Sequence, residues 1–348
     1  MAETKEIEPR KQRGLPPSDK PTLKTIAEMT GLAVTTISRA LNNAPELAQE
    51  TRERVQKIAA DIGYLPDRTA LRLKTGRTNV ITVVMAPDEG LLGYGSALMN
   101  GLAASLRGTA YHLVVTPQFG NMSSMEPIRH IVRNRLADGI VFSRTKPQDE
   151  RVRYLLDHGF PFVTHGRTDW PEPHPFVDFD NAAFAEAAVK RLASEGRRKL
   201  SIILPEAQLI YERFLREGFL RAAHEAGIET EITTEITLGS AADVQRDFII
   251  ARHRQSSAPD GYVCCSEVSA IAVIAGLTDS GASIGEDVDV IAKQATSLFN
   301  NFRPRIQTVF EDFALAGEQL GRLLQRRISG EPAESLQVLD VPEVSWEK

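Results

Sequence analysis

The chain of 348 residues is 42% hydrophobic and 25% charged, which suits two or three folded units of ordinary globular composition. Its net charge of −5 is uneven, because residues 1–77 carry 14 basic and 10 acidic side chains and residues 78–348 carry 27 and 36. No apolar stretch reaches the ~18 residues of a membrane span, and the charged N-terminus does not fit a secretory signal. The two cysteines, Cys264 and Cys265, are adjacent, which excludes a disulfide framework and the usual four-ligand zinc site. We therefore expect a cytoplasmic protein without cofactor or metal, whose basic end binds an anionic partner.

The N-terminal region predicts a charged tail followed by three short helices. Residues 1–20 contain too few large apolar side chains to offset the entropy of ordering, so we expect a disordered tail. Residues 21–65 have helical periodicity, and Thr22 can cap the first helix. The small Ala27, the glycine at Gly31 and the β-branched Ile37 have the spacing that a helix-turn-helix requires.

The second of these helices is predicted to expose a face suited to DNA. Short hydroxyl side chains suit phosphates and base edges, and an arginine can bind guanine through two hydrogen bonds. The candidate residues in and beside this helix are Thr22, Val34, Thr35, Thr36, Ser38, Arg39 and Asn42. The same pattern also suits a three-helix unit with an ordinary solvated face, and spacing alone does not separate the two.

A resemblance to a known family favours the DNA-binding interpretation over an ordinary three-helix unit. The segments TLKTIAEMTGLAVTTISRALN (22–42), ETRERV (50–55) and IGYLP (62–66) resemble the start of lactose-repressor/galactose-repressor (LacI/GalR) regulators. The resemblance extends over nearly the whole chain from residue 22, and this N-terminal block is its most specific part. It implies a three-helix, all-α helix-turn-helix domain followed by an α/β, two-lobed domain like that of periplasmic binding proteins.

The resemblance also assigns residues 66–78 to a hinge helix or linker. In the family this segment forms a helix on operator DNA and inserts a leucine into the central minor-groove step, where Leu73 and the preceding Ala70 correspond here. Unstacking a base step costs a few kcal/mol, which the additional contacts of bent DNA offset. Asp67 stands where the family usually has asparagine. The alternative is a flexible, solvated linker.

Beyond residue 79 short β-branched segments alternate with helical ones, which predicts parallel sheets covered on both faces. The predicted helices cover residues 94–107, 181–195, 211–226 and 268–279. The fully buried strands expected are residues 80–86, 112–116, 139–143, 160–164, 200–204, 261–265 and 288–292.

By resemblance, residues 79–340 form an effector-binding and dimerisation domain. One lobe is expected to contain 79–178 and about 308–340, the other 179–305, with chain crossings near Asp178 and Arg303. Ligands of such folds bind between the lobes at the carboxyl ends of the strands.

The family pattern places effector contacts at Asp180, Arg213 and Glu267. Carboxylates and arginine suit sugar hydroxyls, with which they form paired hydrogen bonds. Structural alternatives remain open: Asp180 and Glu267 could each cap a following helix, and Arg213 could be a solvated helix charge.

A departure follows the last predicted strand, where Lys293 and Gln294 stand in place of the family's usual aromatic residue and aspartate. Lys293 could bind an acidic or phosphorylated ligand, or pair with Glu267 or Asp180, and we favour pairing. Both residues are candidate effector contacts.

Rival functions are weaker. Gly93 and Gly95 after the first strand suggest a dinucleotide loop, but the third glycine and the ribose-binding acid are missing. No catalytic motif is evident, so we do not expect an enzyme, and a pure solute-binding protein would not need the helix-turn-helix spacing. We expect a homodimeric repressor of carbohydrate-utilisation genes that a sugar-type effector releases from a palindromic double-stranded DNA operator. The alternatives are a regulator that needs a non-sugar or phosphorylated co-repressor, and a solute-binding protein without DNA function.

Overall fold

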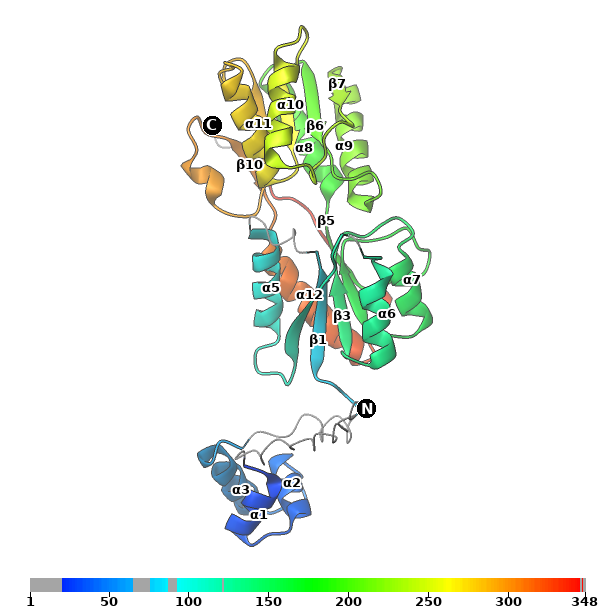
Figure 1. Cartoon of the computed structure of the whole chain (residues 1–348), viewed down its shortest axis with the longest axis vertical. Coiled ribbons are helices and arrows are strands. Elements are labelled where there is room, and N and C mark those ends of the chain that lie inside the picture. The colour runs from blue at the N-terminus through cyan, green and yellow to red at the C-terminus, as the bar shows by residue number, and fades with distance from the viewer. Residues whose placement is uncertain (1–20, 65–75, 87–92, 121, 345, 347–348) are drawn as a thin grey trace, which may run out of the picture. The chain divides into compact units, whose positions relative to one another are not determined.

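The computed structural model describes residues 21–64, 76–86, 93–120, 122–344 and 346. The chain divides into two compact units, residues 1–77 and 78–348 (Figure 1). None of the helices among the described residues has the length and apolar character needed to cross a membrane.

The described residues 21–64 of the first unit form a bundle of three helices, α1 (Leu23–Thr30), α2 (Val34–Leu41) and α3 (Gln49–Asp61). Thr22 caps α1, because its hydroxyl accepts a hydrogen bond from the Thr25 amide (3.3 Å) while the Thr25 hydroxyl accepts one from the Thr22 amide (3.1 Å). Gly31 ends α1 with a φ of 72°, a left-handed conformation that glycine adopts without strain. The core consists of Ile26, Ile37, Ala40, Val55 and Ala59.

The second unit contains two parallel sheets, one in each lobe, with strand orders β11-β5-β4-β3-β1-β2 and β10-β9-β8-β6-β7. The strands of lobe one are β1 (Val80–Met85), β2 (His112–Pro117), β3 (Gly139–Phe142), β4 (Phe162–His165), β5 (Phe176–Phe179) and β11 (Gln337–Asp340). Those of lobe two are β6 (Lys199–Ile203), β7 (Glu229–Ile232), β8 (Gly261–Cys264), β9 (Asp289–Gln294) and β10 (Gln307–Phe310).

Helices cover both faces of each sheet, as the alternating pattern predicts (Figure 1). In lobe one these are α5 (Tyr94–Ser105) and α12 (Phe313–Ile328) on one face, and α6 (Met125–Asn134) and α7 (Glu150–Asp157) on the other. In lobe two they are α8 (Asn181–Ser194) and α9 (Ile210–Ala226) opposite α10 (Ala242–His253) and α11 (Glu267–Asp279). The described residues also form two short 3₁₀ helices, Leu298–Asn301 and Ala333–Ser335.

One strand differs from its predicted environment. Residues 112–116 were expected to be fully buried, but β2 is an edge strand whose Val114 and Val115 are 42% and 48% exposed. The prediction is wrong because an apolar run does not reveal whether a strand has a neighbour on both sides within its own chain.

The crossings between the lobes also differ from expectation at one point. The chain leaves lobe one at Asp180, whose amide donates to the Asp340 carbonyl (2.8 Å), close to the predicted position. It returns at Glu311 and not near Arg303, because β10 pairs in parallel with β9 and completes the sheet of lobe two. The expected start of the returning segment at about residue 308 is therefore three residues too early.

Candidate DNA interface and effector cavity

The candidate DNA face of the first unit lies on α2 and the turn after it. Burial of Ile37 and Ala40 leaves Val34, Thr35 and Arg39 exposed, with Thr36 and Ser38 partly exposed beside them. Hydroxyl, apolar and cationic groups thus share one surface, as contacts to phosphates and base edges require.

The other predicted DNA contacts have more varied surroundings. Thr22 is exposed but engages its hydroxyl in the cap, and the Asn42 amide donates to the Ser38 carbonyl (2.6 Å) at the end of α2. Arg39 is paired with Glu46, which keeps the pKa of that carboxyl below its usual value. Ala70 and Leu73 lie outside the described residues.

The second unit has a cavity of about 510 Å³ between its lobes, within the ~300–1,000 Å³ of typical small-ligand pockets. It opens at the carboxyl ends of both sheets. Ser143, His165 and Asp178 come from the ends of strands in lobe one, and Cys265 and Lys293 from those in lobe two. This is the position that the parallel strand order predicts.

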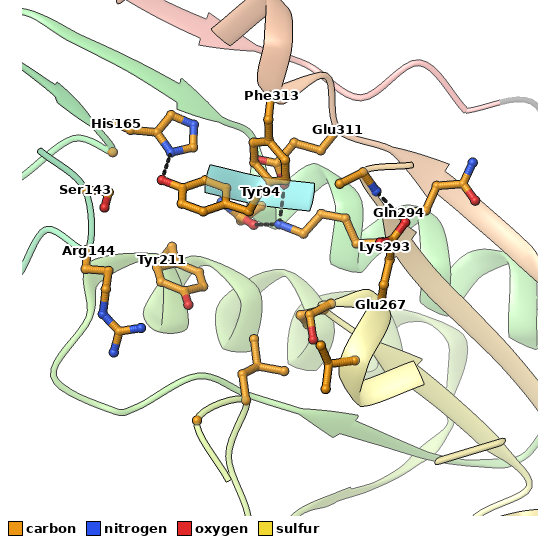
Figure 2. A pocket seen from close by; sticks show the side chains of 18 of the residues that line it. Tyr94, Ser143, Arg144, His165, Tyr211, Glu267, Lys293, Gln294, Glu311 and Phe313 are labelled. Atoms are coloured by element: carbon orange, nitrogen blue, oxygen red, sulfur yellow. Dashed lines mark hydrogen bonds and ion pairs between the residues drawn. The ribbon is translucent and has the colours of Figure 1, made fainter. Parts of the chain in front are cut away.

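One wall of the cavity is aromatic. The rings of Tyr94 and Phe313 meet edge to face at 4.7 Å between centroids, and the Tyr94 hydroxyl lies 3.2 Å from His165 Nδ1 (Figure 2). The helices that carry these two rings pack tightly, since a Cβ on Gly317 would lie 2.1 Å from the Leu98 carbonyl oxygen. Burial lowers the pKa of His165, which keeps the imidazole uncharged.

Sequence analysis predicts none of these three aromatic residues as cavity residues. Tyr94 lies in the glycine-flanked segment that suggested a dinucleotide loop, and the structure places it instead in the first turn of α5. Tyr94 could have been predicted as a cavity residue from its position after the first strand of a parallel sheet.

Lys293 lines the cavity but its ammonium is already occupied. It lies 2.8 Å from Glu311 and donates to the side-chain oxygen of Asn181 at 2.7 Å (Figure 2). The rings of Phe179 and Phe184 lie 5.0 and 5.5 Å from Nζ, and the residue is only 8% exposed. Pairing was favoured from the sequence, but the expected partners, Glu267 and Asp180, were wrong.

Glu267 and Gln294 also line the cavity, in different ways. One Glu267 oxygen accepts hydrogen bonds from the amides of Ala295 and Thr296 and from the Thr296 hydroxyl, at 2.8 to 3.0 Å. Its other oxygen, and the side-chain oxygen of Gln294, are buried without a partner among the described residues. Glu267 does not cap α11, because Ser266 does so.

Two predicted effector residues do not line the cavity. Asp180 caps α8, with its side chain accepting from the Ala183 amide at 3.0 Å. Arg213 binds Asp169 of lobe one at 2.6 and 2.9 Å and is 41% exposed. The position of these two residues in the sequence was not sufficient to predict their roles. An acid that follows a strand can cap the next helix or face the ligand, and an arginine on a helix can point into the cavity or away from it.

Arg213 belongs to a set of contacts that join the lobes. Arg144 of lobe one is 2.9 Å from Glu206 of lobe two, and the Ile210 amide donates to the Thr145 carbonyl at 2.9 Å. The arrangement suits a cleft that encloses a small ligand.

Comparisons with known proteins agree with this architecture. Residues 22–67 match the family of bacterial regulatory proteins, lacI family, and residues 189–346 match a periplasmic binding protein-like domain. The chain thus carries a LacI-family DNA-binding segment followed by a periplasmic binding protein-like one. It is a transcriptional regulator that binds DNA through its first unit and an effector through its second.

Full-length relatives support the assignment. The HTH-type transcriptional regulator AglR of Rhizobium meliloti is 29% identical over 87% of this chain and 86% of its own length. The regulator CelR of Thermobifida fusca is 28% identical over 92% and 95%. Both relatives are named as HTH-type transcriptional regulators.

Solved structures show the same fold at lower identity. A CelR–cellobiose complex has a TM-score of 0.68 and 22% identity, covering 94% of this chain and 98% of that one. A lac repressor dimer bound to operator and the anti-inducer ONPF has a TM-score of 0.79 and 18% identity, covering 93% and 97%.

The cavity's Asp178 generates a pH prediction. Burial raises the pKa of this carboxyl to about 6, against the opposing effect of Arg167 at 2.7 Å, and Glu311 raises it further. A raised pKa means that the folded state binds the proton more tightly, so Asp178 favours folding at pH 5 and loses that contribution as pH rises through 6.

We therefore expect wild type to lose about 1 kcal/mol more unfolding free energy than Asp178→Asn between pH 5 and 7.5. Urea unfolding of wild type and Asp178→Asn at both pH values measures this difference in unfolding free energy. Groups that titrate alike in the two proteins do not contribute to the difference. Identical pH dependence in the two proteins would contradict the raised pKa.

Proposed function

We propose that this regulator is a homodimeric repressor of carbohydrate-utilisation genes, which binds a palindromic operator and is released when an uncharged, hydroxyl-rich effector occupies the interlobe cavity. The observation that carries the proposal is the joining, in one chain, of an exposed helix-turn-helix face to an enclosed cavity at the carboxyl ends of two parallel sheets. Because its target is genomic DNA, the protein would act in the cytoplasm and without catalysis.

Dimerisation follows from the size of the DNA-reading unit. One helix such as α2 reads only a few base pairs, so a two-fold pair is needed for useful specificity. Two copies of Leu73, each preceded by Ala70, would enter the minor groove at the centre of the operator. The lac repressor neighbour, described as a dimer on its operator, supports this arrangement.

The hydrogen-bonding groups of the cavity favour an uncharged ligand. Glu267 and Gln294 each present a buried oxygen that has no partner among the described residues, so the ligand would donate hydrogen bonds, as hydroxyl groups do. Lys293 is held by Glu311 and Asn181, and Arg144 is paired with Glu206. In the described part of the cavity wall, a phosphorylated or acidic ligand would therefore face carboxylates and cations that are already paired.

The aromatic wall supports the same class of ligand. Tyr94 and Phe313 offer apolar ring surface beside the polar oxygens, the combination typical of small-molecule sites. The neighbour solved with cellobiose shares the fold. The competing function, co-repression by a phosphorylated metabolite, requires a cation that Lys293 does not supply.

The first test concerns DNA. We expect the full chain to select a palindromic sequence from a genomic fragment library, with affinity that falls steeply with salt. Leu73→Ala should weaken operator binding at least about tenfold and nonspecific binding much less, because the wedge acts on bent specific DNA. Leu71→Ala is the matched control. If no sequence is enriched, with or without metabolites, the proposed operator binding is contradicted and the alternative of a solute-binding protein without DNA function is favoured.

The second test concerns the effector. Neutral mono- and disaccharides, their 6-phosphates and the corresponding uronic acids are compared by thermal shift at equal concentration. A neutral sugar at a hundredfold excess over its Kd should add about 2.7 kcal/mol of stability, whereas its charged analogues should add little. The same sugar should release the operator in a fluorescence-anisotropy assay.

Gln294→Leu should reduce this shift, since it removes an acceptor oxygen from the cavity, and Gln118→Leu outside the cavity serves as control. Stabilisation by a sugar phosphate in place of the neutral sugar would contradict the proposed ligand class and favour the co-repressor alternative.

A further inference from the structure

Arg39, on the candidate DNA face, is paired with the carboxylate of Glu46. Glu46 is not among the DNA contacts predicted from the sequence. Nε and Nη2 of Arg39 both donate to Oε1 of Glu46, with Nε at 2.9 Å. The side chains are 55% and 48% exposed, so this pair lies on the surface and not in the core. Glu46 is in the turn between α2 and α3, and its carboxylate contacts Arg39 in the last turn of α2.

The geometry of the pair limits how Arg39 can bind a base. A guanidinium has five N–H groups in one plane, and it binds guanine O6 and N7 with two of them. Glu46 occupies the edge formed by Nε and Nη2. Of the three N–H groups that remain, two form a parallel pair at the end of the guanidinium, one on Nη1 and one on Nη2.

Hydrogen bonds fix the turn that carries Glu46. The Gln56 amide on α3 donates to the side-chain oxygen of Asn43 (2.6 Å) and to the Ala40 carbonyl (3.2 Å). The Ala44 amide donates to the Arg39 carbonyl at 3.1 Å. Glu46 is therefore presented from a turn tied to both helices, which makes it a defined support for the arginine.

We propose that Glu46 is a positioning residue for sequence recognition: it holds Arg39 so that the end of its guanidinium faces guanine in the major groove. The inference rests on the proposed reading of bases by α2. Without Glu46, Arg39 would also reach the phosphates, because a long cationic side chain without a partner binds either. The carboxylate itself repels phosphates, so Glu46 lowers nonspecific affinity and raises discrimination between sequences.

The test compares full-length wild type, Glu46→Ala and the charge-matched control Glu53→Ala on a random duplex library and on nonspecific duplex. Glu53 is on α3, and its side chain accepts from Gln49. We expect Glu46→Ala to bind nonspecific duplex more tightly, with a salt slope steeper by about one. Its ratio of specific to nonspecific affinity should fall about tenfold, with relaxed guanine preference at one position in each half-site.

Glu53→Ala should raise both affinities by a similar factor and keep the base preference of wild type. In the Arg39→Ala background, Glu46→Ala should no longer change the ratio, because the effect acts through the arginine. An unchanged base preference in Glu46→Ala, or the same response in both glutamate variants, would overturn the inference while leaving DNA recognition intact. If wild type selects no sequence, both the proposed function and the inference about Glu46 fail. That outcome differs from an unchanged base preference in Glu46→Ala, which overturns the inference alone.

Discussion

The arrangement of the second unit depends on one buried ion pair. Lys293 stands at the end of β9, deep in the cleft, and a charge in that position is tolerated only when it is paired and hydrogen-bonded. Its partners come from two of the segments where the chain crosses between lobes: Glu311 follows β10, and Asn181 begins α8. One cation thus ties the end of a strand to two crossings. The oxygens of Glu267 and Gln294 in the cavity have no partner among the described residues, which is the basis for the ligand class proposed above.

Local sequence was sufficient for much of the fold. The spacing of Ala27, Gly31 and Ile37 specifies the turn between two helices, because a left-handed glycine and a buried β-branched residue are local requirements. Most of the buried strands were equally visible. Four strands, β5, β7, β10 and β11, were not predicted, since each has only four residues of mixed character and forms through pairing with distant segments.

The candidate site was harder to predict, and for the same physical reason. Lys293 could be recognised as unusual, but its partner Glu311 follows the neighbouring strand β10, which the sequence did not predict. Asp180 and Arg213 have the residue types that a ligand site needs, yet a helix cap and an ion pair with Asp169 engage them. On the DNA-binding unit, Arg39 was predicted as a base contact, while the effect of Glu46 becomes apparent only when the turn folds beside it. The contacts that form on folding, such as the cap of Asp180 and the pair of Arg213 with Asp169, decide which chemically suitable residues face a ligand.

A double-mutant cycle on Lys293 and Glu311 tests the account most directly. Urea unfolding of wild type, Lys293→Met, Glu311→Met and the double variant gives the coupling free energy between the two side chains. Each single change should cost about 3–5 kcal/mol, because it leaves a buried charge without its partner, and the double variant should cost much less than their sum. Costs that add to within about 0.5 kcal/mol would show that the two charges do not depend on each other and would contradict the account.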